Sequence, residues 1–164
     1  MKNIITLFAL LLAGFCTAQN TIGKELERLN KNSVPYISVQ ELQAKPKYIV
    51  LDARELKEYN TSHLKNAIYV GFNKFDNSKV TKKVENKNTP IVVYCSIGVR
   101  SERIAEKLVK LGYTNVYNLY GGIFEYKNSG GTVVNNNNKV TDSVHTYNKR
   151  WSEYLEKGIK VYEN

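Results

Sequence analysis

The sequence predicts an α/β protein in which helices cover both faces of a parallel sheet. Short apolar, β-branched segments alternate with polar segments of helical or turn character, which is the pattern of strands joined by helical crossovers. The apolar segments lie at residues 35–39, 47–53, 66–71, 90–95 and 115–122. Ile91–Tyr94 is apolar throughout, as in strands buried on both faces. At 164 residues the chain has room for one ordinary domain, and its crossovers should be right-handed.

The segments between the strands carry the helical signals. Ile104, Leu108 and Leu111 recur at helical spacing with charged residues on the other faces, so residues 100–111 should form a helix. Shorter helical or turn segments are expected at residues 40–44, 55–60 and 72–86, and a short charged helix at residues 23–31.

The C-terminal part of the chain predicts a helical extension. Residues 121–134 should form a short helix bounded by glycine turns, and the asparagine run at residues 135–138 indicates a loop or linker. Residues 141–157 predict a helix with an apolar stripe that docks on the main domain. The members of this stripe are Val144, Tyr147, Trp151, Tyr154 and Leu155.

The first 18 residues predict a cleavable secretory signal. Lys2 precedes an apolar run at residues 4–13, and small residues follow it up to Ala18, where we expect cleavage. The run is too short to span a bilayer, so no integral membrane span is expected. The protein should therefore be exported, to the periplasm or outside the cell. An alternative is a lipoprotein anchored through Cys16, but the bulky Phe15 before it disfavours that.

Charge and composition exclude some classes of function. The formal charge is +9, but the basic residues are scattered, whereas nucleic-acid binding proteins gather them in a stripe or cluster. We therefore expect no nucleic acid partner; a mild positive field suits small anionic substrates. His63 and His145 are the only histidines, and without a cysteine cluster we predict no metal site.

Cys95 is the candidate nucleophile. Once the signal is removed it is the sole thiol, so no internal disulfide can form, and an unpaired thiol in an oxidising compartment needs a reason. A buried, inert cysteine is the plain alternative. However, Cys95 lies where a strand ends and a helix begins, which is where open α/β sheets bind ligands. The free N–H groups and positive dipole end of a helix bind anions and lower a thiol pKa.

The residues after Cys95 suit attack on an anionic substrate. Gly98 allows a tight turn, and Arg100 offers a planar charge that matches an oxyanion. Ser101 can cap a free N–H or donate to a sulfur anion. A thiol with these neighbours predicts nucleophilic catalysis.

Three motifs resemble those of the single-domain rhodanese family. "CSIGVRS" (residues 95–101) resembles its active-site loop, Cys-x-x-Gly-x-Arg followed by Ser or Thr. "LDARELKEYNTSHLKNAIYV" (51–70) is similar to its upstream signature. "LYGGIFEYKNSGGTVV" (119–134) is similar to its closing signature, with Tyr126 where the family usually has Trp. The resemblance covers residues 35–134, and leaves the signal, residues 19–34 and the extension at 135–164 outside it.

The resemblance implies a rhodanese-like fold of five parallel strands flanked by helices, and sulfur transfer through a persulfide on Cys95. Thiosulfate or another small anionic sulfur donor would load the cysteine, and a thiol or cyanide would unload it, with ping-pong kinetics and no cofactor. Asp52 and Arg54 would support the site, and Arg100 would bind the anionic end of the donor. The implied substrate-binding residues are Ser96, Ile97, Gly98, Val99, Arg100 and Ser101.

Two other functions remain open at this stage. Cysteine phosphatases use a similar loop, but with a longer segment between Cys and Arg than residues 96–99 provide here. A rhodanese-like module without catalysis, which binds a partner protein or senses oxidants, is the stronger alternative, because fold does not fix function and an acidic thiol also suits a sensor.

Overall fold

The computed structural model describes residues 21–44 and 47–163, and the predicted signal lies outside them. The elements of the main domain are α1 Ile22–Leu29, β1 Tyr36–Ile37, α2 Val39–Ala44, β2 Ile49–Asp52, α3 Leu56–Thr61, β3 His63–Leu64, β4 Ile68–Tyr69, α4 Ser78–Thr81, β5 Ile91–Tyr94, α5 Val99–Lys110, β6 Val116–Leu119 and α6 Gly122–Asn128. The remaining elements are β7 Val133–Val134, β8 Val140–Thr141, β9 Ser143–His145, α7 Lys149–Ser152 and β10 Ile159–Val161. None of the described helices is both long and apolar enough to cross a membrane.

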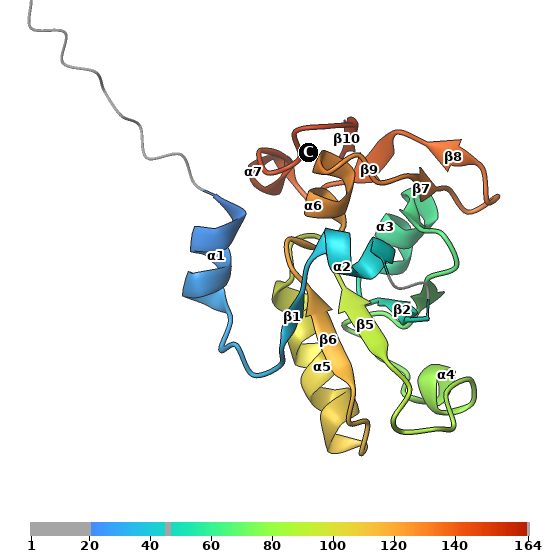
Figure 1. Ribbon diagram of the computed structural model, residues 1–164. Helices are drawn as coiled ribbons and strands as arrows, with labels where there is room; N and C mark the ends of the chain where they lie inside the picture. Colours follow the sequence, from blue (N-terminus) through green and yellow to red (C-terminus); the bar gives the residue numbers. More distant parts are fainter. Residues whose placement is uncertain (1–20, 45–46, 164) are drawn as a thin grey trace, which may run out of the picture.

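A five-stranded parallel sheet forms the centre of the domain, in the order β1-β6-β5-β2-β4 (Figure 1). The predicted parallel α/β fold is therefore confirmed. β5 lies in the middle of the sheet, between β6 and β2. The residue that follows β5 therefore lies at the centre of the carboxyl edge of the sheet.

The two faces of the sheet pack into two apolar cores, because successive side chains of a strand point to opposite faces. Val92 and Tyr94 of β5 face one core, which α2 and α6 help to close. Ile91 and Val93 face the other, together with residues of α4 and α5. All four β5 side chains are fully buried, which explains why this segment is apolar at every position.

The glycine pair at the start of α6, Gly121 and Gly122, lets this helix approach the end of β5. The N–H of Ile123 donates to the Cys95 carbonyl at 2.9 Å, and the N–H of Phe124 donates to the Ser96 carbonyl at 3.1 Å. Gly122 has a φ of +53°, and a Cβ there would lie 2.3 Å from the Cys95 carbonyl oxygen. Only glycine fits this close approach, which holds the backbone of Cys95 in place.

The loop predicted at residues 135–138 is present, whereas the helix predicted at residues 141–157 is corrected by the structure. Residues 135–138 form the turn of an antiparallel hairpin, in which β7 pairs with both β8 and β3. The rest of the C-terminal segment (residues 135–163) consists of β8, β9, the short α7 and β10, which pairs in parallel with β9. Its β-branched residues favour strands, and Gly158, at a φ of +113°, provides the turn before β10. Residues 72–86, where helical or turn structure was expected, contain the short helix α4 with turns on both sides of it.

The C-terminal segment nevertheless docks on the main domain, as its apolar stripe suggested. Val144 and Leu155 are fully buried in the same core as Val92 and Tyr94. The Tyr154 hydroxyl donates to the buried Glu25 carboxylate of α1 at 3.0 Å. β9, α7 and β10 thus lie over the end of the domain at which β5 meets α5 (Figure 1).

Candidate active site

Cys95 lies directly after β5, at the start of the loop that leads into α5; we call residues 95–101 the Cys95 loop. Gly98 has a φ of +117°, the left-handed region that favours glycine, and turns the chain into the helix. This turn brings the N–H of Gly98 to 3.2 Å from the Cys95 sulfur, to which it donates. The hydroxyl of Ser101, in the first turn of α5, lies 3.5 Å from the same sulfur.

Asn118 of β6 holds the Cys95 loop in this conformation. Its side-chain Nδ2 donates to the Gly98 carbonyl at 2.8 Å, and its Oδ1 accepts from the Ser101 hydroxyl at 2.7 Å. Asn30 also donates to the Gly98 carbonyl, at 3.0 Å. Asn118 is fully buried and was not predicted as a site residue, because its position one strand away from Cys95 becomes evident only when β5 and β6 are paired.

Arg100 is held by a buried carboxylate. Its two terminal nitrogens donate to the two oxygens of Glu58 in α3, at 2.6 and 2.7 Å, and one of them also donates to the Ser96 hydroxyl at 2.9 Å. A guanidinium has five N–H donors, so two remain without a partner among the described residues. Glu58 is 1% exposed, and hydrogen bonds and charge from Arg100 outweigh the effect of burial and lower its pKa below 4.5.

The pKa of the Cys95 thiol is lowered from its ordinary value. Burial alone would raise it, but the positive charge of Arg100 and the donors from Ser101 and Gly98 more than offset this effect. A lowered pKa increases the thiolate fraction, and the thiolate is the nucleophilic form. The surroundings of Cys95 therefore differ from those of an inert core cysteine.

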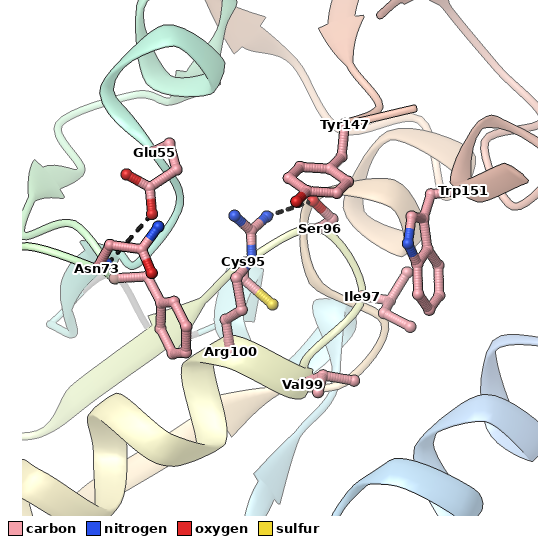
Figure 2. A pocket seen from close by; sticks show the side chains of 10 residues that line it. Glu55, Asn73, Cys95, Ser96, Ile97, Val99, Arg100, Tyr147 and Trp151 are labelled. Atoms are coloured by element: carbon pink, nitrogen blue, oxygen red, sulfur yellow. Dashed lines mark hydrogen bonds between the residues drawn. The ribbon is translucent and has the colours of Figure 1, made fainter. Parts of the chain in front are cut away.

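A cavity of about 230 Å³ opens beside the Cys95 sulfur. Its lining residues are Glu55, Phe72, Asn73, Cys95, Ser96, Ile97, Val99, Arg100, Tyr147 and Trp151. Figure 2 shows Tyr147 and Trp151 on the same side of the cavity as Ser96 and Ile97, with Glu55 and Asn73 across from them. Tyr147 and Trp151 belong to the C-terminal segment, so this segment takes part in the cavity and is more than a structural support.

Asp52 and Arg54 do not line the cavity. Both are fully buried, and Arg54 donates to the Asp52 carboxylate at 2.6 Å and to the Ser62 carbonyl at 2.6 Å. The Tyr94 hydroxyl donates to the same carboxylate at 2.5 Å. This group ties β2, β5 and the end of α3 together beneath the Cys95 loop.

The structure thus brings some of the predicted site residues together in one cavity and places others around it. Cys95, Ser96, Ile97, Val99 and Arg100 line the cavity. Gly98 and Ser101 lie behind the sulfur, within reach of it. Glu58, Asn118 and the cavity role of Tyr147 and Trp151 were not predicted, although "KEY" at residues 57–59 lies inside the upstream motif and contains Glu58.

The parallel sheet, the cysteine at the carboxyl end of its central strand and the following helix N-terminus define a class of α/β protein with a thiol of lowered pKa surrounded by hydrogen-bond donors. A comparison with family models is more specific. The model described as "Rhodanese-like domain" matches residues 37–129, which is more than half of the chain. The chain belongs to the rhodanese-like family.

Relatives of this chain include enzymes of two named activities. It is 30% identical over 94 residues to a thiosulfate sulfurtransferase GlpE from Coxiella burnetii, covering 57% of this chain and 85% of that protein. It is 38% identical over 104 residues to a tRNA uridine(34) hydroxylase from Aster yellows witches'-broom phytoplasma, covering 60% of this chain but only 34% of that protein.

Solved structures show the same fold. A thiosulfate sulfurtransferase from Pseudomonas aeruginosa superposes with a TM-score of 0.58 at 24% identity, over 70% of this chain and 22% of that one. A rhodanese-related protein from Thermoplasma volcanium gives a TM-score of 0.52 at 28% identity, over 61% of this chain and 97% of that one. At 24% identity, the likeness to the Pseudomonas aeruginosa protein concerns the fold alone.

Proposed function

We propose that this protein is a sulfurtransferase that carries sulfane sulfur as a persulfide on Cys95, with thiosulfate as a competent donor. The observation that carries the proposal is the Cys95 sulfur itself, which borders the cavity and receives an N–H from Gly98 at 3.2 Å near the charge of Arg100. GlpE supports this choice over the tRNA hydroxylases, because the chain covers 85% of the former and only 34% of the latter.

The first half-reaction loads the cysteine. The Cys95 thiolate attacks the outer sulfur of thiosulfate, a bond forms between the two sulfurs, and the original S–S bond breaks with its electron pair leaving on sulfite. The two unpaired N–H donors of Arg100 suit the sulfonate oxygens of the donor. The donor groups around Cys95, which favour the thiolate, also favour the anionic outer sulfur of the persulfide.

The second half-reaction unloads it. A thiolate or cyanide attacks the outer sulfur, and the Cys95 thiolate leaves. Because the donor product departs before the acceptor binds, steady-state kinetics should be ping-pong.

Intact mass before and after addition of thiosulfate tests the proposal. The reduced protein should gain one sulfur atom and lose it on addition of cyanide, and Cys95→Ser should gain none. A wild-type protein that gains no sulfur while Cys95 still reacts with iodoacetamide would contradict the proposal and favour a binding or oxidant-sensing module.

We also propose that the protein is exported, on the basis of the N-terminal signal pattern. Fractionation of cells that produce the full chain, followed by N-terminal sequencing of the mature form, tests this. We expect a periplasmic or secreted product that begins at Gln19. A product that retains Lys2 in the cytoplasmic fraction contradicts export, and one that carries a lipid on Cys16 supports the lipoprotein alternative.

A further inference from the structure

The C-terminal segment supplies one wall of the cavity beside Cys95. This segment follows the region matched by the family model, which ends at residue 129. Tyr147 and Trp151 nevertheless belong to the lining, beside Ser96 and Ile97 of the Cys95 loop (Figure 2). The two aromatic residues of this wall therefore come from a part of the chain that lies outside the matched family domain.

Both aromatic side chains are fixed in position by their own contacts. The backbone N–H of Trp151 donates to the side-chain Oδ1 of Asn148 at 3.1 Å, which caps α7, and the Trp151 ring lies 5.6 Å from that of Tyr154. The ring of Tyr147 faces the guanidinium carbon of Arg100 at 5.6 Å. Tyr147 has a φ of +67°, a conformation that non-glycine residues adopt rarely and that often occurs at functional sites.

The charges and polarity of the cavity favour an apolar ligand. Five of its ten lining side chains are apolar or aromatic: Phe72, Ile97, Val99, Tyr147 and Trp151. Arg100 is the cation of this lining, and Glu58 pairs with it through both carboxylate oxygens. The other charged lining residue, Glu55, is acidic. Beyond the Cys95 loop, the cavity therefore offers little attraction to a second anion.

The size of the cavity also exceeds what a small inorganic acceptor needs. A cavity of about 150 Å³ lined by apolar side chains accommodates benzene in a well-studied protein. The cavity here measures about 230 Å³, which leaves room for an aromatic ring together with a sulfur atom.

We infer that Tyr147 and Trp151 select, as the sulfur acceptor, an organic thiol whose body is an apolar or aromatic group. The inference rests on the proposed function and names the substrate class of the same site. The acceptor thiolate attacks the outer sulfur of the Cys95 persulfide, its new S–S bond forms as the Cys95 S–S bond breaks, and the electron pair returns to Cys95 as thiolate. The product is the persulfide of the acceptor, and no oxidant or reductant is required.

Single-turnover kinetics with two acceptors tests the selection. Benzyl mercaptan and 2-mercaptoethanol are both alkyl thiols of similar acidity, so their intrinsic nucleophilicity is matched. The loaded wild-type protein should react faster with benzyl mercaptan. Trp151→Ala and Tyr147→Ala should each lower that rate constant about 3- to 10-fold, as expected for loss of an aromatic contact. The rate constant with 2-mercaptoethanol should change less than about 2-fold.

The control variant is Ile159→Ala, an exposed residue of the same segment outside the cavity, which should leave both rates unchanged. Equal losses with both acceptors, or no loss with either, would overturn the inference. If Trp151→Ala unfolds the segment, Tyr147→Ala still tests the wall, because the Tyr147 side chain is 54% exposed.

A binding measurement separates this inference from the proposed function. Trp151 is the single tryptophan of the chain, so its fluorescence reports directly on the cavity. In Cys95→Ser under reducing conditions, benzyl mercaptan should change this fluorescence saturably and 2-mercaptoethanol should not. No saturable change overturns the inference even if the wild-type persulfide forms. A saturable change without persulfide formation in the wild type overturns the proposed function and the acceptor role with it, while the binding of aromatic thiols by the cavity stands.

Discussion

Glu58→Gln tests the ion pair that holds the Cys95 loop to α3. Oε1 of Glu58 accepts from Arg100 at 2.7 Å and from the Ser96 hydroxyl at 3.2 Å. Oε2 accepts from Arg100 at 2.6 Å and from the backbone N–H of Glu55 at 2.9 Å. A glutamine replaces one oxygen by an NH₂ group, so a hydrogen bond from Arg100 becomes a donor-donor contact in either orientation.

The expected loss of stability is about 3 kcal/mol. Removing one partner of a buried ion pair costs about 3–5 kcal/mol, because the remaining charge stays buried without compensation. The Arg100 side chain is 19% exposed, so water relieves part of this cost and the lower end of that range applies. For a domain of this size, the melting temperature should fall by roughly 6–12 °C.

Urea unfolding of both proteins at pH 7 gives the difference in the free energy of unfolding. The control is Asp142→Asn, which breaks the surface pair with Lys127, where the Asp142 side chain is 72% exposed; exposed pairs contribute about 0–1 kcal/mol. The lowered pKa of Glu58 adds a pH dependence. The stability from its charge is complete above the unfolded pKa and is lost as the pH falls through the lower folded pKa, and Glu58→Gln should lack this loss. A difference below about 0.5 kcal/mol, similar to the control, would refute the reasoning.

Three further predictions concern the thiol, the glycine pair and the C-terminal segment. The iodoacetamide reaction of Cys95, followed against pH, should have its midpoint below that of an ordinary thiol, because the pKa of Cys95 is lowered; a midpoint above it would contradict the site electrostatics. Gly122→Ala should lower both the melting temperature and the persulfide yield, since its Cβ would meet the Cys95 carbonyl at 2.3 Å, and unchanged values would mean that α6 does not hold Cys95. Leu155→Ala should cost about 2–5 kcal/mol in urea unfolding because Leu155 is fully buried, and a cost near zero would mean that the segment does not dock.

The parallel sheet could be predicted because its signals are local. Each strand has an apolar, mostly β-branched or aromatic core, and β5 is apolar at every position because both its faces are buried. The position of Cys95 after this run, and the helical spacing after residue 100, placed the thiol at a strand-to-helix junction without any knowledge of strand order. The chemistry of that junction follows from the free N–H groups that begin every helix.

The partners of the Cys95 loop could not be predicted in the same way, because they come from distant parts of the chain. Glu58 precedes Arg100 by 42 residues, and Asn118 follows Ser101 by 17. Nothing in the spacing of these residues indicates which carboxylate or amide will be adjacent after folding. The pairing of β6 with β5 decides the position of Asn118, and the packing of α3 decides that of Glu58.

The C-terminal segment shows how an apolar pattern can predict burial while it predicts the wrong element. The stripe at residues 144–155 has helical spacing, and Val144, Tyr154 and Leu155 are indeed buried. These residues reach the core through a strand, a turn and a short helix. The hydrophobic effect favours burial of any apolar side chain, whatever the secondary structure that carries it. Tyr147 and Trp151 depart from the stripe at the turn around Asn148 and line the Cys95 cavity instead. A single continuous helix would give all five side chains one common face, so the break at Asn148 is what lets Tyr147 and Trp151 line the cavity while Val144 and Leu155 stay in the core.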